Sequence, residues 1–402
     1  MIAPTSPAVQ RGLIALVQVL ALAVWFSVSA VVPSVQADFS ISSAAAVWLT
    51  AAVQLGFVTG AVLSTVANLA DRIPTHLLLA ASAAIAALST SALAWFADGL
   101  GVMIALRFLT GVFLAGVYPV GMKLMASWAP PARRGLSMGL LIGALTVGSA
   151  LPNLIGGLAD LPWRATLQVT ALIGLTGAAL AFTFIRPGPY LTRSRTQLEP
   201  GYIIDMFRNR RARLINLGYF GHMWELYALW TWIPVFVLNS SAQFSGSGQV
   251  MVFLTMGLGG LAGCLIGGWA ADRFGRARAA IAALTVSGLC CVLSPVAFDA
   301  TAVVLTALCA VWGASVIADS GVFSTALSES VEAEHVGTAL TGQTAIGFAL
   351  TVASIQIVPL VAAATDWKYA LVVLAAGPVV GVLALRALPP EKHESRHPKV
   401  TA

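Results

Sequence analysis

Charge is what this sequence lacks most. Only 9% of its 402 residues are Asp, Glu, Lys or Arg, whereas soluble globular proteins have about 25%. A surface with so little charge cannot keep a compact globule in solution, so the composition excludes an ordinary soluble protein. Hydrophobic residues make up 58% of the chain, and they gather in repeated runs of about 20 residues, the length that crosses a bilayer. The sequence therefore predicts an all-α membrane protein with many spans.

Cysteine and concentrated positive charge are also scarce. The four cysteines show no C-x-x-C spacing, which excludes a disulfide framework and a zinc site. The 22 Lys and Arg exceed the 16 Asp and Glu, but they are spread over short loops rather than along a basic stripe with interleaved aromatics. No Walker A motif is present, so direct use of ATP is not expected. We expect no cofactor, no metal and no nucleic-acid partner.

The apolar runs divide the chain into twelve predicted membrane-spanning helices. The first, which begins at Gly12, is too long for a signal-peptide core and is read as a retained helix. The first six spans cover about 12–34, 44–70, 76–96, 100–127, 135–157 and 163–186. The other six cover about 214–238, 248–271, 279–298, 302–328, 337–361 and 367–387.

The placement of cations predicts the orientation of these spans. Arg107 and Lys123 fall within a span, and only Arg164 and Lys368 fall on the outer surface if both termini are cytoplasmic. That leaves 18 of the 22 Lys and Arg on the cytoplasmic side, as the positive-inside rule requires. We therefore expect a multi-pass protein of the cell membrane, most naturally a bacterial inner membrane, with cytoplasmic N- and C-termini.

The second half of the chain repeats features of the first. Matching residues recur 201 or 202 positions apart, in the pairs Pro33 and Pro234, Asp71 and Asp272, Arg72 and Arg273, Gly111 and Gly313, and Gly135 and Gly337. This predicts two six-helix bundles related by a pseudo-two-fold repeat, at 1–186 and 214–402, with a cytoplasmic linker at 187–213. Such duplication is typical of transporters that bind substrate between the halves.

Two short motifs resemble those of a known family. The loop after the eighth span reads GWAADRFGRAR from Gly268 to Arg278, which resembles the GxxxDRxGR(R/K) signature of the major facilitator superfamily. In the fourth span, the segment from Arg107 to Gly111 (RFLTG) is similar to the RxxQG element of that family. The resemblance implies twelve transmembrane helices in two bundles that move a small solute by alternating access.

The resemblance also implies that the loop residues take part in gating. A glycine at Gly268 permits close helix contact, Asp272 can cap a helix N-terminus, and the arginines hold the loop in the cytoplasm. The expected gating residues are Gly268, Asp272, Arg273, Gly275, Arg276, Asp71, Arg72 and Lys123. Lys123 either reaches the interface with its charged end or pairs with Asp319 at an inner gate.

Five ionisable side chains fall within predicted spans: Arg107, Lys123, His222, Glu225 and Asp319. A charge at bilayer depth costs at least about 2.5–3.5 kcal/mol, so each needs a partner or a function. In the resembled family, spans 1, 4, 7 and 10 line the central cavity, and all five residues lie on spans 4, 7 and 10. This distribution favours a transport function.

The acidic groups and the histidine are the predicted proton-coupling residues, with Glu225 as the preferred proton carrier. Glu225 lies near mid-membrane, and His222 lies one helical turn from it on the same face, where the two can share a proton. Asp319 is a second proton carrier or a cation site. In the alternative interpretation, His222 and Glu225 form a hydrogen-bonded pair inside the bundle.

The remaining candidates bind substrate. Arg107 serves either as an anion clamp or as a structural arginine bonded to helix carbonyls. The aromatic residues Trp25, Tyr118, Tyr227 and Trp230 form a ligand cage with it, or else they belong to the core or face lipid.

These observations predict a proton-coupled secondary active transporter of a small solute, acting as a monomer in the lipid bilayer. Arg107 favours a small organic or inorganic anion as substrate, as does a similarity to bacterial small-anion permeases of the cyanate and nitrate type. Proton-driven efflux of drug-like or cationic compounds is the alternative, because Glu225 and Asp319 favour a cation. A membrane-embedded enzyme or a channel is less favoured, since the sequence has no clustered nucleophile or metal ligands.

Overall fold

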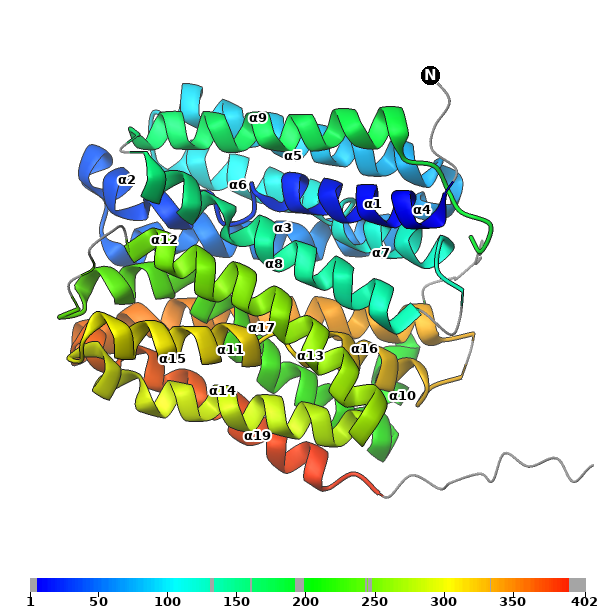
Figure 1. Cartoon of the computed structure of the whole chain (residues 1–402). Helices are drawn as coiled ribbons and strands as arrows, with labels where there is room; N and C mark the ends of the chain where they lie inside the picture. Colours follow the sequence, from blue (N-terminus) through cyan, green and yellow to red (C-terminus); the bar gives the residue numbers. More distant parts are fainter. Residues whose placement is uncertain are drawn as a thin grey trace, which may run out of the picture.

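The chain folds into helices joined by short loops (Figure 1). The computed structural model describes residues 6–130, 134–159, 161–191, 199–242, 244, 248–332 and 334–389, and none of these residues forms a strand. The first half contains α1 (Pro7–Leu22), η1 (Ser29–Val31), α2 (Val32–Phe39), α3 (Ser43–Val66), α4 (Leu69–Arg72), α5 (Thr75–Phe96), α6 (Leu100–Leu114), α7 (Tyr118–Ser127), α8 (Arg134–Leu158) and α9 (Trp163–Phe184).

The second half follows the same order. It contains α10 (Pro200–Arg208), α11 (Arg210–Asn239), α12 (Gly248–Val252), the π-helical turn η3 (Phe253–Leu258), α13 (Gly259–Phe274), α14 (Arg276–Phe298), α15 (Ala302–Ser315), α16 (Ser320–Ser328), α17 (Val336–Ala364), α18 (Trp367–Ala370), η4 (Leu371–Ala375) and α19 (Ala376–Arg386). The predicted linker therefore includes α10 and the first turn of α11, while residues 192–198 lie outside the described part of the chain.

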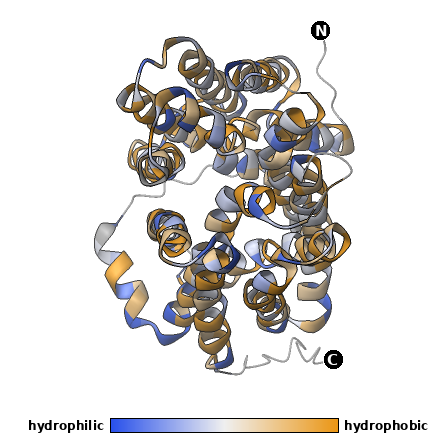
Figure 2. Cartoon of the chain, turned by 90° about the vertical axis from the view of Figure 1, so that its left-hand side faces the viewer, coloured by the Kyte–Doolittle hydropathy of each residue, from blue (hydrophilic) through white to orange (hydrophobic). Residues whose placement is uncertain are grey.

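Ten helical segments among the described residues are long and apolar enough to cross a membrane. The two other predicted spans are α1, which is apolar but has 16 residues, and α11, whose 30 residues include several polar ones. Large hydrophobic side chains remain exposed on the outside of the molecule, such as Trp95 and Val303, and hydrophobic residues colour most of the helical ribbon in Figure 2. The twelve-helix, all-α membrane fold is confirmed.

Three spans that the sequence predicts as continuous are interrupted. Span 1 unwinds after Leu22 and resumes as η1, span 4 breaks between α6 and α7, and span 10 breaks between α15 and α16. The last two breaks follow Leu114 and Ser315, which are 201 positions apart. The breaks therefore belong to the internal repeat, and an apolar composition alone does not reveal them.

Close helix contacts repeat at the same offset. Gly111 of α6 faces the carbonyl oxygen of Val53 in α3, and Gly313 of α15 faces that of Thr255, so both partners differ by 202 positions. In each glycine the absence of a side chain lets the two backbones meet. The sequence repeat is therefore a repeat of packing as well.

Alanine at Gly111 is expected to destabilise the first half by about 1–3 kcal/mol, because a methyl group there would collide with the Val53 carbonyl and force α3 and α6 apart. The matched control is Gly101→Ala in the same helix, where an added Cβ would meet nothing within 4 Å. The stabilities of the Gly111→Ala and Gly101→Ala variants are compared by thermal unfolding of the purified proteins in detergent. Equal transition temperatures would show that this contact is not tight.

The two halves lie against each other along their length, with α1–α9 in the upper layer of Figure 1 and α11–α19 in the lower layer. Helix α3 packs on α17, and α8 packs on η3 and α13. Thr65 and Thr341 approach to 3.4 Å on the side where α1 begins, and Gln249 donates to the carbonyl of Ala30 at 3.1 Å on the opposite side. The halves are thus in contact at both ends.

Candidate functional site

Arg107 is fully buried and is held by backbone oxygens. Its Nε donates to the carbonyl of Leu49 at 3.2 Å, and Nη1 donates to that of Val24 at 3.0 Å. Nη2 donates to the carbonyl of Trp25 in a short contact, and Nη1 also reaches Ser27 Oγ at 3.4 Å. Val24 and Trp25 lie in the stretch where α1 has unwound, so Arg107 replaces helical hydrogen bonds that this stretch lacks.

The charge of Arg107 has no acidic partner. No carboxylate forms an ion pair with it anywhere in the described residues. The geometry is that of the structural alternative, an arginine bonded to carbonyls, and the role of anion clamp stays a prediction. A buried charge of this kind favours a bound anion in its vicinity.

Aromatic rings from both halves meet beside this arginine. We call the group the aromatic cluster: Trp25, Phe26, Phe57, Tyr227, Trp230 and Phe348. The Trp25 ring lies 5.8 Å from that of Tyr227, and Phe57 lies 4.4 Å from Phe348, so the contacts cross from one half to the other.

The sequence found only part of this cluster. It proposed Trp25, Tyr227 and Trp230, which the structure brings together, and it missed Phe26, Phe57 and Phe348 because phenylalanine is ordinary in any apolar span. Tyr118 opens α7 and packs against the hydrophobic core, but it makes none of the ring contacts recorded for the described residues.

Several buried polar atoms near the meeting of the halves lack a partner. The indole nitrogens of Trp25 and Trp230 make no hydrogen bond with any described residue, and neither does the side-chain amide of Gln54. Gln54 lies between Thr50, which pairs with Ser29 of the broken helix, and Phe57 of the aromatic cluster on one face of α3. Unpaired buried polar groups are rare in folded proteins, so these atoms are candidates for contact with a ligand.

A cavity of about 350 Å³ lies next to the aromatic cluster. Its lining includes Ala30 and Pro234, which are one helical turn beyond Phe26 and Trp230. The remaining lining residues are Ser29, Pro33, Val235, Val237, Leu238, Ala242, Phe244, Gly248 and Gln249. The cavity therefore lies about one helical turn from the cluster, on the side opposite the start of α1, and no ring of the cluster lines it.

His222 and Asp319 form a second buried polar group. Nδ1 of His222 lies 2.8 Å from Oδ1 of Asp319, and its Nε2 lies 3.0 Å from Oγ of Ser320. This contact lacks the alignment of a hydrogen bond, so both carboxylate oxygens of Asp319 have no hydrogen-bond partner among the described residues. Asp319 sits at the break before α16, as the residue that precedes its first turn.

Glu225 makes its hydrogen bonds to α14 and α15 rather than to the His222–Asp319 pair. Its carboxylate accepts hydrogen bonds from Trp312 Nε1 at 2.6 Å, Ser287 Oγ at 2.9 Å and Cys291 Sγ at 3.3 Å. The sequence-based expectation that His222 and Glu225 form a hydrogen-bonded pair is wrong, because each side chain contacts different helices. Ser287, Cys291 and Trp312 carry no signal in the sequence that would identify them as partners of Glu225.

The chain matches the family model of the Major Facilitator Superfamily over residues 14–355. The chain belongs to this superfamily. It is 26% identical over 208 residues to the D-galactonate transporter of Escherichia coli O6:H1, covering 45% of this chain and 48% of that protein. It is 25% identical over 275 residues to the gentisate transporter of Corynebacterium glutamicum, covering 64% and 59%.

A third relative is the probable sulfoacetate transporter SauU of Cupriavidus necator, 25% identical over 234 residues that cover 52% of this chain and 54% of that protein. The chain thus spans about half the length of the curated relatives it matches. Among solved structures, the partially occluded, inward-open xylose transporter XylE of E. coli superimposes with a TM-score of 0.73 at 15% identity. That alignment covers 96% of this chain and 100% of XylE, and it shows the superfamily fold.

The superfamily loop motif has a different geometry in each half. In the first half, Asp71 pairs with Lys123 at 2.7 Å, and Lys123 also donates to the carbonyl of Ala70. The Lys123–Asp319 pair considered from the sequence is therefore absent, since both residues have other partners. Arg72 is exposed in α4.

In the second half, the complete motif joins α13 to α14. Gly275 has φ +91°, a backbone conformation that favours glycine, and Arg276 pairs with Glu329. The expected close helix contact at Gly268 is wrong, because an added Cβ there would meet nothing within 4 Å, whereas Gly263 and Gly267 face backbone of α15 and the turn after it.

The remaining two motif residues lie on α13. The carboxylate of Asp272 lies near Gly135 in the first turn of α8, 3.9 Å from the position of an added Cβ, where a helix N-terminus favours a negative charge. Arg273 is exposed in the last turn of α13. The complete motif thus contacts the other half through Asp272.

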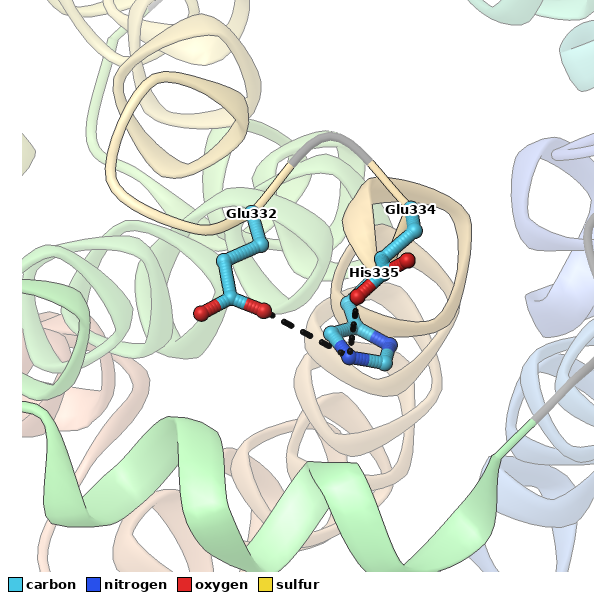
Figure 3. A group of neighbouring side chains, drawn as sticks. All are labelled: Glu332, Glu334 and His335. Carbon is cyan, nitrogen blue, oxygen red and sulfur yellow. Dashed lines mark ion pairs between the residues drawn. The ribbon is translucent and has the colours of Figure 1, made fainter.

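A cluster that sequence reasoning did not single out surrounds His335 (Figure 3). Its Nε2 lies 3.7 Å from Glu332 and 3.5 Å from Glu334, while Nδ1 lies 3.6 Å from Glu199. The ring stacks on Tyr202 at 3.9 Å. Since all three carboxylates are exposed, this cluster is best described as a surface ion-pair network that connects α10 to the start of α17.

Proposed function

We propose that this superfamily member is a proton-coupled secondary transporter of a small organic anion. The observation that carries the proposal is Arg107, a buried cation of the first half that forms no ion pair with any described residue and binds the backbone of Trp25, whose ring meets the second half. The names of the relatives support it, since galactonate, sulfoacetate and gentisate are all anions of organic acids. A buried positive charge is stabilised when an anion enters, so an anion gains more from this site than a neutral solute does.

The proposed transport cycle is alternating access. Bundles 1–186 and 214–402, joined by the linker 187–213, rock about the aromatic cluster in a cell membrane with both termini in the cytoplasm. Substrate contacts Arg107, Trp25, Tyr118, Tyr227 and Trp230 in this proposal. The gating residues of both loop motifs, with Lys123, move with the bundle to which each belongs.

The coupling proton is proposed to exchange at His222 and Asp319. The unpaired Oδ2 of Asp319 and its position at a helix break support this assignment. Glu225 remains a second candidate, although its three hydrogen-bond donors favour a fixed, structural carboxylate. Tyr219 and Cys264 are the other ionisable side chains near the His222–Asp319 pair.

Uptake into proteoliposomes tests this function. With an inward proton gradient of one pH unit, the purified protein is expected to accumulate a radiolabelled organic anion up to about tenfold per coupled proton. A protonophore should remove the accumulation but leave exchange of labelled for unlabelled substrate. Gradient-driven movement of organic cations with no movement of anions would support the efflux alternative instead, for which the carboxylate of Asp319 is the supporting feature.

A further inference from the structure

We propose that the substrate is a small aromatic carboxylate, bound with its ring in the aromatic cluster, rather than a sugar acid. The inference rests on the proposed function and narrows it. The relatives leave the choice open, since one is named for galactonate, a sugar acid, and another for gentisate, an aromatic acid. The chemistry of the cluster distinguishes the two classes.

The first argument is the shape and polarity of the cluster. Trp25, Phe26 and Phe57 come from the first half, while Tyr227, Trp230 and Phe348 come from the second. Their rings touch across the boundary at 4.4 to 6.0 Å between centroids. When the halves part, a flat ring can replace these contacts by stacking or edge-to-face packing on either side.

The second argument is the number of hydrogen-bonding groups. Within the cluster, the unpaired groups are the indole N–H of Trp25 and that of Trp230, with the Gln54 amide beside them. A carboxylate has few polar atoms, which this small number of donors can satisfy. A sugar acid would also bury several hydroxyl groups against phenylalanine and tryptophan faces, and each unpaired hydroxyl would weaken binding.

The third argument is charge. The guanidinium of Arg107 binds the backbone carbonyl of Trp25, so its positive charge lies directly behind the tryptophan whose indole nitrogen is free. No acid pairs with this arginine in the described part of the chain. The carboxylate is thus attracted to the Trp25 side of the cluster, and the ring extends towards Tyr227 and Phe348.

The fourth argument is access. The neighbouring cavity of about 350 Å³ is lined mainly by apolar side chains, including Pro33, Pro234 and Phe244. This volume lies at the small end of the range for ligand pockets, about 300–1,000 Å³, and it admits a single ring. Its apolar lining favours an aromatic acid over a polyhydroxylated chain.

Ligand binding to the purified full-length protein tests the proposal. Benzoate and 4-hydroxybenzoate are compared with gluconate by thermal shift and by quenching of tryptophan fluorescence. We expect benzoate to bind at least about tenfold more tightly than gluconate. Tighter binding of gluconate would overturn the inference, and this comparison on the unaltered protein does not depend on whether any variant folds.

Two tryptophan variants locate the site. Trp25→Phe and Trp230→Phe keep a ring but remove the free N–H, and each is expected to weaken benzoate binding about tenfold. The matched control is Trp232→Phe, whose N–H is already engaged by the carbonyl of Ile355 at 2.8 Å, so binding should stay within about twofold. Equal losses in all three variants would contradict the assignment.

Uptake measurements in proteoliposomes distinguish a failure of this inference from a failure of the proposed function. Proton-driven uptake of gluconate without uptake of benzoate would refute the aromatic substrate and leave the anion transporter standing. If proteoliposomes take up neither anion, the proposed function itself fails and the inference fails with it. Proton-driven uptake of benzoate alone, in excess of the passive uptake of this weak acid by protein-free liposomes, supports both.

Discussion

Replacing Arg107 with methionine is expected to lower the free energy of unfolding by at least about 3 kcal/mol. Methionine has a similar length but no donor, so the carbonyls of Leu49, Val24 and Trp25 would lose the hydrogen bonds that Arg107 now gives them. Water cannot replace these bonds at bilayer depth, and each unpaired buried carbonyl costs about 1–3 kcal/mol. The unwound part of helix 1 should therefore lose its defined path.

Thermal unfolding of the detergent-purified protein measures this loss. Arg164→Met is the matched control, because Arg164 pairs with Asp38 at an exposed position, and such pairs contribute about 0–1 kcal/mol. Arg107→Lys separates charge from geometry, since lysine retains the charge but has fewer donors to span three carbonyls. We expect its stability to lie between those of the Met variant and the native protein. An Arg107→Met protein as stable as Arg164→Met would show that the carbonyl contacts are not needed.

The sequence predicted the architecture well because the bilayer imposes it. Hydrophobic length and the repeat placed the spans after the first within about four residues of the observed helices, as for 163–186 against Trp163–Phe184, whereas the first helix begins at Pro7 rather than Gly12. It did not predict the breaks after Leu22, Leu114 and Ser315. An unwound stretch at membrane depth depends on partners from other helices, as Val24 and Trp25 depend on Arg107, and such partners are invisible in a local pattern.

The sequence predicted many residues of the candidate site but not which of them contact one another. In a helix that is apolar all round, periodicity does not reveal which face meets the other half and which meets its own bundle. Glu225 and His222 are three residues apart on α11, yet one contacts Trp312 and the other contacts Asp319. The phenylalanines of the aromatic cluster were missed for the same reason, since only their position across the boundary distinguishes them.

Asp319 and Glu225 differ in their hydrogen bonding, and this difference predicts different effects on proton coupling when each is neutralised. Asp319→Asn is expected to abolish proton-driven accumulation, a loss of about tenfold or more under a gradient of one pH unit, while exchange of substrate continues. The amide cannot gain or lose a proton in this range, so the carrier can still alternate but no longer couples. His222→Gln should reduce coupling in the same direction, because His222 is the group that contacts Asp319 at 2.8 Å.

Glu225→Gln provides the contrasting variant in the second half. The amide oxygen in place of Oε1 can still accept from Trp312 and Cys291, and the amide nitrogen in place of Oε2 faces Ser287, so we expect a lower thermal transition but preserved proton-driven accumulation. Both variants are compared in the same proteoliposome preparation, with exchange as the measure of a functional carrier. If Glu225→Gln loses accumulation and Asp319→Asn keeps it, the coupling group is Glu225, and its three donors then serve to set its proton affinity rather than to hold the bundle together.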